Sequence, residues 1–289
     1  MNSKNTYTIG ELLEKMVGAF NSINMEQSEA EAVAIIAELL ECSRGTVLFD
    51  RHKTVSGAIA NEAEKITCRR LQNEPWQYIF HRAYFRDLEL YVDKNVLIPR
   101  PETELLVDWV LEHLPQHGSV LDLGTGSGAI AVSIAAERRD SQVTACDIST
   151  SALEIARRNS RSANAENIEF VSSDLFSALP ERKFDIIAAN LPYVTEKEYT
   201  ALSPEVKNFE PKLALTSGDD GLDLIRKAIA AAPDHLTTHG TVILEMSDWQ
   251  TTVAAEIFAD AMCWCAIEII RDYTGRNRFV AARKRDEQR

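Results

Sequence analysis

The second half of this 289-residue chain alternates between apolar runs of strand length and amphipathic stretches of helix length. Strands are expected at residues 119–123, 142–148, 168–173, 184–190, 241–246, 266–271 and 278–283, with helices after Gly128, Ser149, Gly221 and Asp248. Such alternation predicts an α/β fold, a mostly parallel sheet with helices on both faces. The last two strands have no helix between them, so we expect them to form an antiparallel hairpin at the sheet edge.

The first eighty or so residues contain helical patterns instead. Thr8-Ile9-Gly10-Glu11 and Ser28-Glu29-Ala30-Glu31 match the capping box that opens a helix, and an apolar stripe at helical spacing follows each. A third helix is expected over residues 54–71. Residues 75–79 and 85–92 alternate in the manner of short strands.

These patterns divide the chain into three parts. Residues 1–83 form a helical bundle with no catalytic constellation, suited to docking a partner or covering a cleft. Residues 84–96 form a hairpin-like connector, and residues 97–289 form the α/β domain.

The net charge of −13 argues against free nucleic acid as a partner, because proteins that grip phosphates usually show a basic face. Residues 1–83 hold 9 Lys and Arg against 11 Asp and Glu, a net of −2 that leaves −11 for the remainder. No apolar run is long enough to cross a bilayer. The start of the chain lacks a signal-peptide layout. Five scattered cysteines indicate a reducing compartment, which favours the cytoplasm. No metal site is expected.

Residues 120–128 read as a strand that runs into a glycine-rich turn and then a helix. Glycines let the backbone approach a ligand closely, and a helix start offers unpaired N–H groups. The spacing is Gly-x-Gly-x-Gly (Gly124, Gly126, Gly128) rather than Gly-x-Gly-x-x-Gly, the dinucleotide fingerprint. That departure favours S-adenosylmethionine as the cofactor.

Acidic residues end the next two expected strands. Asp147 stands nineteen positions after Gly128, where a carboxylate can bind both ribose hydroxyls of a nucleoside. Its alternative role is to cap the helix that follows. Asp174 can receive an adenine amino group with Leu175 beside the ring, or it can be an ordinary loop residue.

The fourth expected strand ends abruptly in Asn190-Leu191-Pro192-Tyr193. Pro192 cannot donate a ladder hydrogen bond, so this strand must stop near Asn190, where ligands bind in open α/β sheets. The Asn190 side-chain oxygen and the Leu191 carbonyl can each accept one N–H from a planar NH₂ group. This would aim a poorly nucleophilic nitrogen at a methyl carbon. Tyr193 can stack on the group or wall it in.

Four motifs in order resemble the HemK/PrmC family of protein-glutamine methyltransferases over nearly the whole chain. They are residues 97–104 (Leu-Ile-Pro-Arg-Pro-Glu-Thr-Glu), the glycine turn at 122–128, residues 190–193 and Phe209-Glu210-Pro211. The resemblance implies a class I S-adenosylmethionine-dependent methyltransferase, Rossmann-like with a seven-stranded mixed sheet. It implies as substrate the glutamine of the Gly-Gly-Gln motif in class I peptide chain release factors, contacted by the amino-terminal bundle.

By position, the resemblance assigns cofactor binding to Gly124, Thr125, Gly126, Ser127, Gly128 and Asp147, with Leu175 on the adenine side. Asn190, whose amide would face the sulfonium end, is also expected to contact the cofactor. Asn190 and the backbone at Leu191 would hold the substrate amide, completed by Pro192 and Tyr193. Arg100 and Glu102 would shape the rim and Glu210 the substrate-side loop, although Arg100 can equally serve a structural salt bridge.

Two departures and one competing function follow from the same residues. The family usually has Asn-Pro-Pro-Tyr, so Leu191 should act through its carbonyl, and a bulky aromatic often stands at Leu175. Asn-Leu-Pro-Tyr is also the spelling of ribosomal RNA adenine dimethyltransferases, whose flipped adenine presents a similar NH₂ group. The acidic charge and the segment at 97–104 argue against RNA. The third candidate function is that of a non-catalytic translation factor that only binds the cofactor.

Overall fold

The computed structural model describes residues 6–286, which divide into two compact units at Phe80 and His81. That division falls three residues before the end of the predicted bundle. Each unit has its own core and is described separately.

The first unit is a small helical bundle. Its elements are β1 (Thr6–Thr8), α1 (Ile9–Asn21), α2 (Ser28–Leu39), α3 (Arg44–Phe49), β2 (Thr54–Ser56), α4 (Gly57–Leu71) and α5 (Trp76–Ile79). Apolar side chains of α1, α2 and α4 share one core, in which Leu13, Phe20 and Ile35 are fully buried. The short strands β1 and β2 pair antiparallel.

Three local predictions in this unit differ from the structure. The helix expected over residues 54–71 begins at Gly57, because residues 54–56 form β2. The capping box at Thr8 and Glu11 is present, with both reciprocal bonds (3.1 and 2.9 Å). The predicted box at Ser28 is wrong, because Ser28 is the first residue of α2 and donates to the Met25 carbonyl. Residues 75–79 were expected as a strand but form α5. Five residues are too few to separate the two periodicities.

The second unit is a three-layer α/β domain. It begins with the hairpin β3 (Ala83–Phe85) and β4 (Leu88–Leu90) and α6 (Thr103–His113). The sheet strands are β5 (Ser119–Leu123), β6 (Gln142–Asp147), β7 (Ile168–Ser172), β8 (Phe184–Ala189), β9 (Leu236–Glu245), β10 (Trp264–Arg271) and β11 (Asn277–Lys284). The helices between them are α7 (Ala129–Glu137), α8 (Thr150–Ser162), α9 (Glu196–Ala201), α10 (Pro204–Phe209), α11 (Asp223–Ala231) and α12 (Asp248–Asp260).

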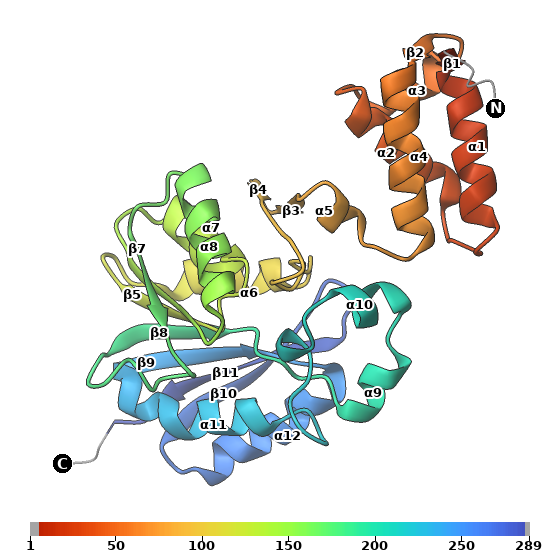
Figure 1. Cartoon of the computed structure of the whole chain (residues 1–289). Coiled ribbons are helices and arrows are strands. Elements are labelled where there is room, and N and C mark those ends of the chain that lie inside the picture. The colour runs from red at the N-terminus through yellow and green to blue at the C-terminus, as the bar shows by residue number, and fades with distance from the viewer. Residues whose placement is uncertain (1–5, 287–289) are drawn as a thin grey trace. The chain divides into compact units, whose positions relative to one another are not determined.

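The seven strands form one mixed sheet in the order β10-β11-β9-β8-β5-β6-β7 (Figure 1). The strands from β5 to β9 run parallel, and β11 runs antiparallel to both β9 and β10. The fold class and the edge hairpin predicted from the sequence are therefore confirmed. Within residues 6–286, no helix is both long and apolar enough to cross a membrane.

Alternate residues of the central strands enter two separate cores. In β8, Ile187 and Ala189 pack with α11 and α12, while Ile186 and Ala188 pack with α6 and α7. This explains why β8 reads as a continuous apolar run: both of its faces are buried.

The chain reverses its direction of sheet growth at β5. From β5 it adds β6 and then β7 on one side, and it returns to place β8 and β9 on the other. Ligands of open α/β sheets bind outside the carboxyl ends of the strands at such a reversal. The turn after β5 and the loop after β8 therefore meet where a ligand is expected.

Candidate active site

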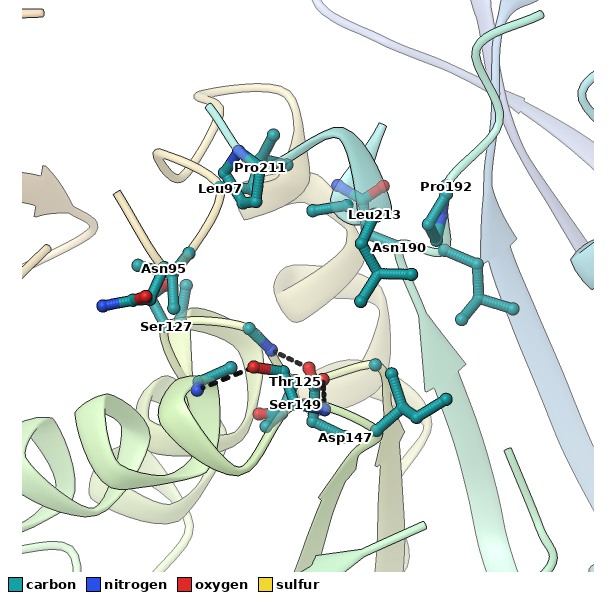
Figure 2. A pocket seen from close by; sticks show the side chains of 18 of the residues that line it. Asn95, Leu97, Thr125, Ser127, Asp147, Ser149, Asn190, Pro192, Pro211 and Leu213 are labelled. Atoms are coloured by element: carbon teal, nitrogen blue, oxygen red, sulfur yellow. Dashed lines mark hydrogen bonds between the residues drawn. The ribbon is translucent and has the colours of Figure 1, made fainter. Parts of the chain in front are cut away.

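A pocket of about 310 Å³ lies at this reversal point. Its lining comes from the turns that follow β5, β6, β7 and β8, and from two loops at residues 94–103 and 211–214. In Figure 2, Asp147 and Thr125 lie at one end, and Asn190 and Pro192 lie across from Asn95 and Ser127. The sequence predicted residues from all four strand ends, and the structure brings them together.

The glycine turn needs its glycines for different reasons. Gly124, Gly126 and Gly128 all have left-handed φ values of 80°, 54° and 84°. A Cβ on Gly128 would lie 3.0 Å from Ala156 Cβ, whereas a Cβ on Gly126 would meet no atom within 4 Å. Gly126 lines the pocket, so the open space beside it lets a ligand approach the backbone.

Asp147 fastens the glycine turn to the end of β6. One carboxylate oxygen accepts the Gly126 N–H at 2.9 Å and the other accepts the Ser149 N–H at 2.8 Å. Ser149, rather than Asp147, caps α8 by accepting the Ala152 N–H. Asp147 is half-buried and lines the pocket, and burial raises its pKa. Its remaining lone pairs are available to ribose hydroxyls.

Asp122 is a structural acid that the sequence reading did not assign a role. It is fully buried in β5, and its Oδ2 accepts from the Thr125 hydroxyl (2.6 Å) and the Ala131 N–H (3.1 Å). Burial raises the pKa of Asp122 to about 7. These bonds hold the glycine turn against the start of α7. An acid placed inside an otherwise apolar strand was the signal in the sequence.

The pocket lining after β6 and β7 contains two apolar side chains and one exposed acid. Asp174 is exposed and lines the pocket, as does the half-buried Leu175 beside it. Ile148, which follows Asp147 directly, also lines it and is 54% exposed. The sequence reading missed Ile148, although an apolar residue just after the strand-ending acid was visible. Leu175 and Ile148 offer apolar contacts for a planar ring, with a carboxylate at its edge.

Asn190 lies just beyond β8 and lines the pocket together with Leu191 and Pro192. Its side-chain nitrogen donates to the Thr103 hydroxyl at 3.0 Å. The Leu191 side chain is buried, and one of its methyl groups would lie 3.0 Å from a Cβ on Gly124. This side chain therefore packs against the glycine turn.

Tyr193 is not among the described residues that line the pocket. Its carbonyl accepts from the Gln250 side chain at 2.8 Å, which fixes the loop after β8 to α12. Burial, reinforced by the nearby Glu245 carboxylate, raises the pKa of Tyr193 to about 12. The phenol is therefore neutral.

Arg100 combines two structural features. It lines the pocket, and its guanidinium pairs with Glu210 at 2.6 Å. Glu210 is buried, does not line the pocket, and accepts the Ile98 N–H at 3.2 Å. Glu102 precedes α6 and does not line the pocket either. The Arg100–Glu210 pair joins the loop at 94–103 to the loop at 211–214, so both close the same side of the pocket.

The residues present fit S-adenosylmethionine. The glycine turn leaves open space at Gly126, Asp147 has free lone pairs for a ribose, and Ile148 and Leu175 offer an apolar seat for a base. Among residues 6–286, no three His, Cys, Asp or Glu side chains are grouped so that they could hold a metal ion. Methyl transfer from a sulfonium needs no metal.

Comparison with known proteins supports the same class. Residues 101–206 match the family model described as methyltransferase small domain, and residues 11–80 match the PrmC N-terminal domain. A crystal structure of a methyltransferase from Pyrococcus furiosus superposes with a TM-score of 0.53 at 20% identity, covering 76% of this chain and 98% of that chain. This likeness concerns the fold alone. The fold and the pocket are those of class I S-adenosylmethionine-dependent methyltransferases.

Sequence relatives define the family. A release factor glutamine methyltransferase of Neisseria gonorrhoeae is 40% identical over 252 residues, covering 86% of this chain and 91% of the relative. One of Thermodesulfovibrio yellowstonii is 36% identical over 258 residues, covering 88% of this chain and 92% of the relative. This chain belongs to the release factor glutamine methyltransferase family.

Proposed function

We propose that this protein transfers a methyl group from S-adenosylmethionine to the side-chain amide nitrogen of the glutamine in the Gly-Gly-Gln motif of class I peptide chain release factors. The observation that carries the proposal is the orientation of Asn190. Its nitrogen is bonded to Thr103, and its oxygen receives no hydrogen bond from the described residues. An acceptor is therefore held at the pocket edge, where the substrate nitrogen must arrive.

The amide nitrogen of glutamine is a weak nucleophile because its lone pair is delocalised into the carbonyl group. When bound, the cofactor supplies an electrophilic methyl carbon with a good leaving group. The chain's task is alignment, which can account for most of the barrier lowering in such a displacement. Asn190 Oδ1 and the Leu191 carbonyl each accept one N–H of the substrate. These bonds strengthen as positive charge grows on the nitrogen.

The other pocket residues divide between the two ligands. Gly124 to Gly128 and Asp147 hold the cofactor, with Asp174 and Leu175 at its adenine. Pro192 bounds the amide pocket. Tyr193 and Glu210 support it from behind, Tyr193 by fixing its own loop to α12 and Glu210 by positioning Arg100.

The helical unit over residues 6–80 is proposed to dock the release factor. It contains no catalytic cluster, and Phe49 at the end of α3 is 88% exposed beside the half-exposed Leu48. Exposed apolar side chains of this size are typical of contact surfaces. The proposal places the protein in the cytoplasm, where release factors act, without a nucleic acid partner of its own.

Labelled cofactor and a purified release factor test this assignment. The factor should acquire label on its Gly-Gly-Gln glutamine, and a factor with that glutamine changed to alanine should acquire none. Label that survives the glutamine change would overturn the substrate assignment. Ribosomal RNA in a parallel reaction tests the competing adenine substrate and should remain unlabelled.

A further inference from the structure

Three side chains form a hydrogen-bonded series at the pocket, of which Asn190 and Thr103 line the pocket and Glu245 does not. Glu245 ends β9, Thr103 begins α6 and Asn190 follows β8. The Thr103 hydroxyl donates to Glu245 Oε2 at 2.7 Å and accepts from Asn190 Nδ2 at 3.0 Å. Thr103 is 4% exposed and Glu245 is 1% exposed, so water cannot easily replace either bond.

The negative charge on Glu245 determines which group donates in each of these two hydrogen bonds. An ionised carboxylate only accepts hydrogen bonds, so the single hydroxyl proton of Thr103 must point to Glu245. The Thr103 oxygen can then only accept from Asn190. If the carboxamide turned over, Asn190 Oδ1 would face the Thr103 oxygen with no proton between them. The amide group therefore has to present its NH₂ to Thr103 and its oxygen elsewhere.

We propose that Thr103 and Glu245 are positioning residues, which fix the carboxamide of Asn190 so that its oxygen, and not its NH₂ group, meets the substrate nitrogen. This inference rests on the proposed function and adds to it two residues that do not themselves touch the reacting atoms. Without them, the carboxamide can present NH₂ to the substrate NH₂, an arrangement that repels rather than aligns.

Charged groups from several elements determine when Glu245 is ionised. Burial raises the pKa of Glu245 to about 7, and the neighbouring Glu102 acts in the same direction. Thr103, Arg278 on β11 and Arg100 act against this rise. Tyr193 also faces the carboxylate but stays neutral. Above about pH 7 the ionised Glu245 forces the Thr103 hydroxyl to donate to it, which keeps the Asn190 NH₂ group facing Thr103. Below about pH 7 the protonated acid can itself donate to Thr103, and the Asn190 carboxamide is then free to turn over.

Four variants of the full-length protein test the inference with a release factor as substrate. Thr103→Val removes the hydroxyl at nearly constant volume, and kcat at pH 8 should fall about 10-fold, the effect of one lost orienting hydrogen bond. The Kd for S-adenosylhomocysteine should stay within about 2-fold, because Thr103 bonds neither the glycine turn nor Asp147. Thr103→Ser keeps the hydroxyl and should restore most of kcat.

Glu245→Gln keeps the shape but has no titration and no fixed direction. Its kcat should be reduced at pH 8, and the decline in kcat that we expect for the wild type from pH 8 to pH 6 should become smaller, with only the contribution of Asp122 remaining. Thr251→Val is the matched control, because Thr251 is a fully buried threonine in α12 whose hydroxyl bonds only the Asp248 carbonyl. Its kcat should equal that of the wild type. The inference is overturned if Thr103→Val keeps full kcat, or if serine restores nothing.

A spectroscopic readout separates this inference from the substrate assignment. The side-chain NH₂ resonances of Asn190 are identified by their loss in Asn190→Asp. In Thr103→Val, the proton that bonds Thr103 should shift upfield and exchange faster with solvent. If the chemical shifts and exchange rates of the Asn190 NH₂ protons stayed unchanged, the hydrogen bond from Asn190 to Thr103 would be contradicted even if activity changed. A wild type that leaves the release factor unlabelled, but shows this NMR response, would refute the substrate and retain the positioning. Thermal melts of all variants check that each one folds.

Discussion

Asp147 connects the conformation of the glycine turn to the binding of a nucleoside. Its two oxygens accept from Gly126 and Ser149, so the carboxylate that is proposed to receive the ribose also keeps the turn in place. Bonds between a carboxylate and backbone N–H groups are stronger than those between neutral groups. We therefore expect this one side chain to affect both the shape of the turn and the binding of the cofactor.

Asp147→Asn should raise the Kd for S-adenosylhomocysteine by about 10-fold or more, because the new NH₂ group cannot accept the backbone N–H that it faces, and the remaining oxygen no longer carries a charge. Isothermal titration calorimetry measures the change. Asp174→Asn is the control at the same rim. Asp174 is exposed and bonds no part of the turn in the described residues, so its Kd should change by no more than about 3-fold. Equal effects at both positions would contradict the distinction.

At the scale of elements, two glycines in the turn between β5 and α7 are expected to affect different properties, one the binding of the cofactor and the other the stability of the fold. Gly126 lines the ligand side of the turn, whereas Gly128 packs against Ala156 and Val132 on the helix side. The two glycines share left-handed backbone conformations, so an alanine at either position has a similar backbone strain of about 1 kcal/mol. What differs is where the added methyl group goes.

Gly126→Ala should weaken cofactor binding more than Gly128→Ala, because its methyl group enters the space that the ligand needs. Gly128→Ala should lower the melting temperature more, because its Cβ would lie 3.0 Å from Ala156 and 3.1 Å from Val132. Calorimetric binding and thermal melts of both variants give the comparison. If Gly128→Ala weakened binding more, or Gly126→Ala lowered the melting temperature more, the assignment of Gly126 to the ligand side and Gly128 to the helix side would be wrong.

The strands of the sheet were predictable because each is an apolar run of strand length between turn signals. β8 is an example: both its faces are buried, so the run is unbroken until Pro192 forbids its continuation. The short helix α5 was not predictable. Pro75 precedes it and Tyr78 and Ile79 are buried side by side, a pattern that five residues cannot distinguish from a strand.

Residues of the site could be predicted where a short local motif marks each of them. The glycine turn, Asp147 and Asn190 each stand at the end of a recognisable strand. The hydrogen bond between Thr103 and Glu245 was not predictable, because 142 positions separate the two residues and only the order of the strands brings them together. Neither residue type signals its role: a threonine opening a helix and an acid ending a strand are common.

At the scale of the whole molecule, two units with separate cores imply separable tasks. The core of residues 6–80 and the two cores that flank the sheet contain no residues in common. Every residue that lines the pocket lies in the second unit, and the docking proposed for the first unit concerns the release factor.

A fragment of residues 81–289 should bind S-adenosylhomocysteine with a Kd within about 3-fold of the full chain, because every pocket residue lies in it. It should methylate an intact release factor much more slowly than the full chain does. A short Gly-Gly-Gln peptide, which lacks any docking surface, should be methylated equally by both. A fragment that methylates the intact factor at the full rate would remove the docking role from the first unit.

The central claim is that Asn190 aligns the substrate nitrogen with the methyl carbon. Single-turnover transfer from a preformed complex of enzyme, labelled cofactor and release factor measures this step directly. Asn190→Ala should slow transfer by about 100-fold or more, the effect typical of removing one group that stabilises a transition state, while the Kd for S-adenosylhomocysteine stays nearly unchanged. A variant that transfers the methyl group at the wild-type rate would contradict the account.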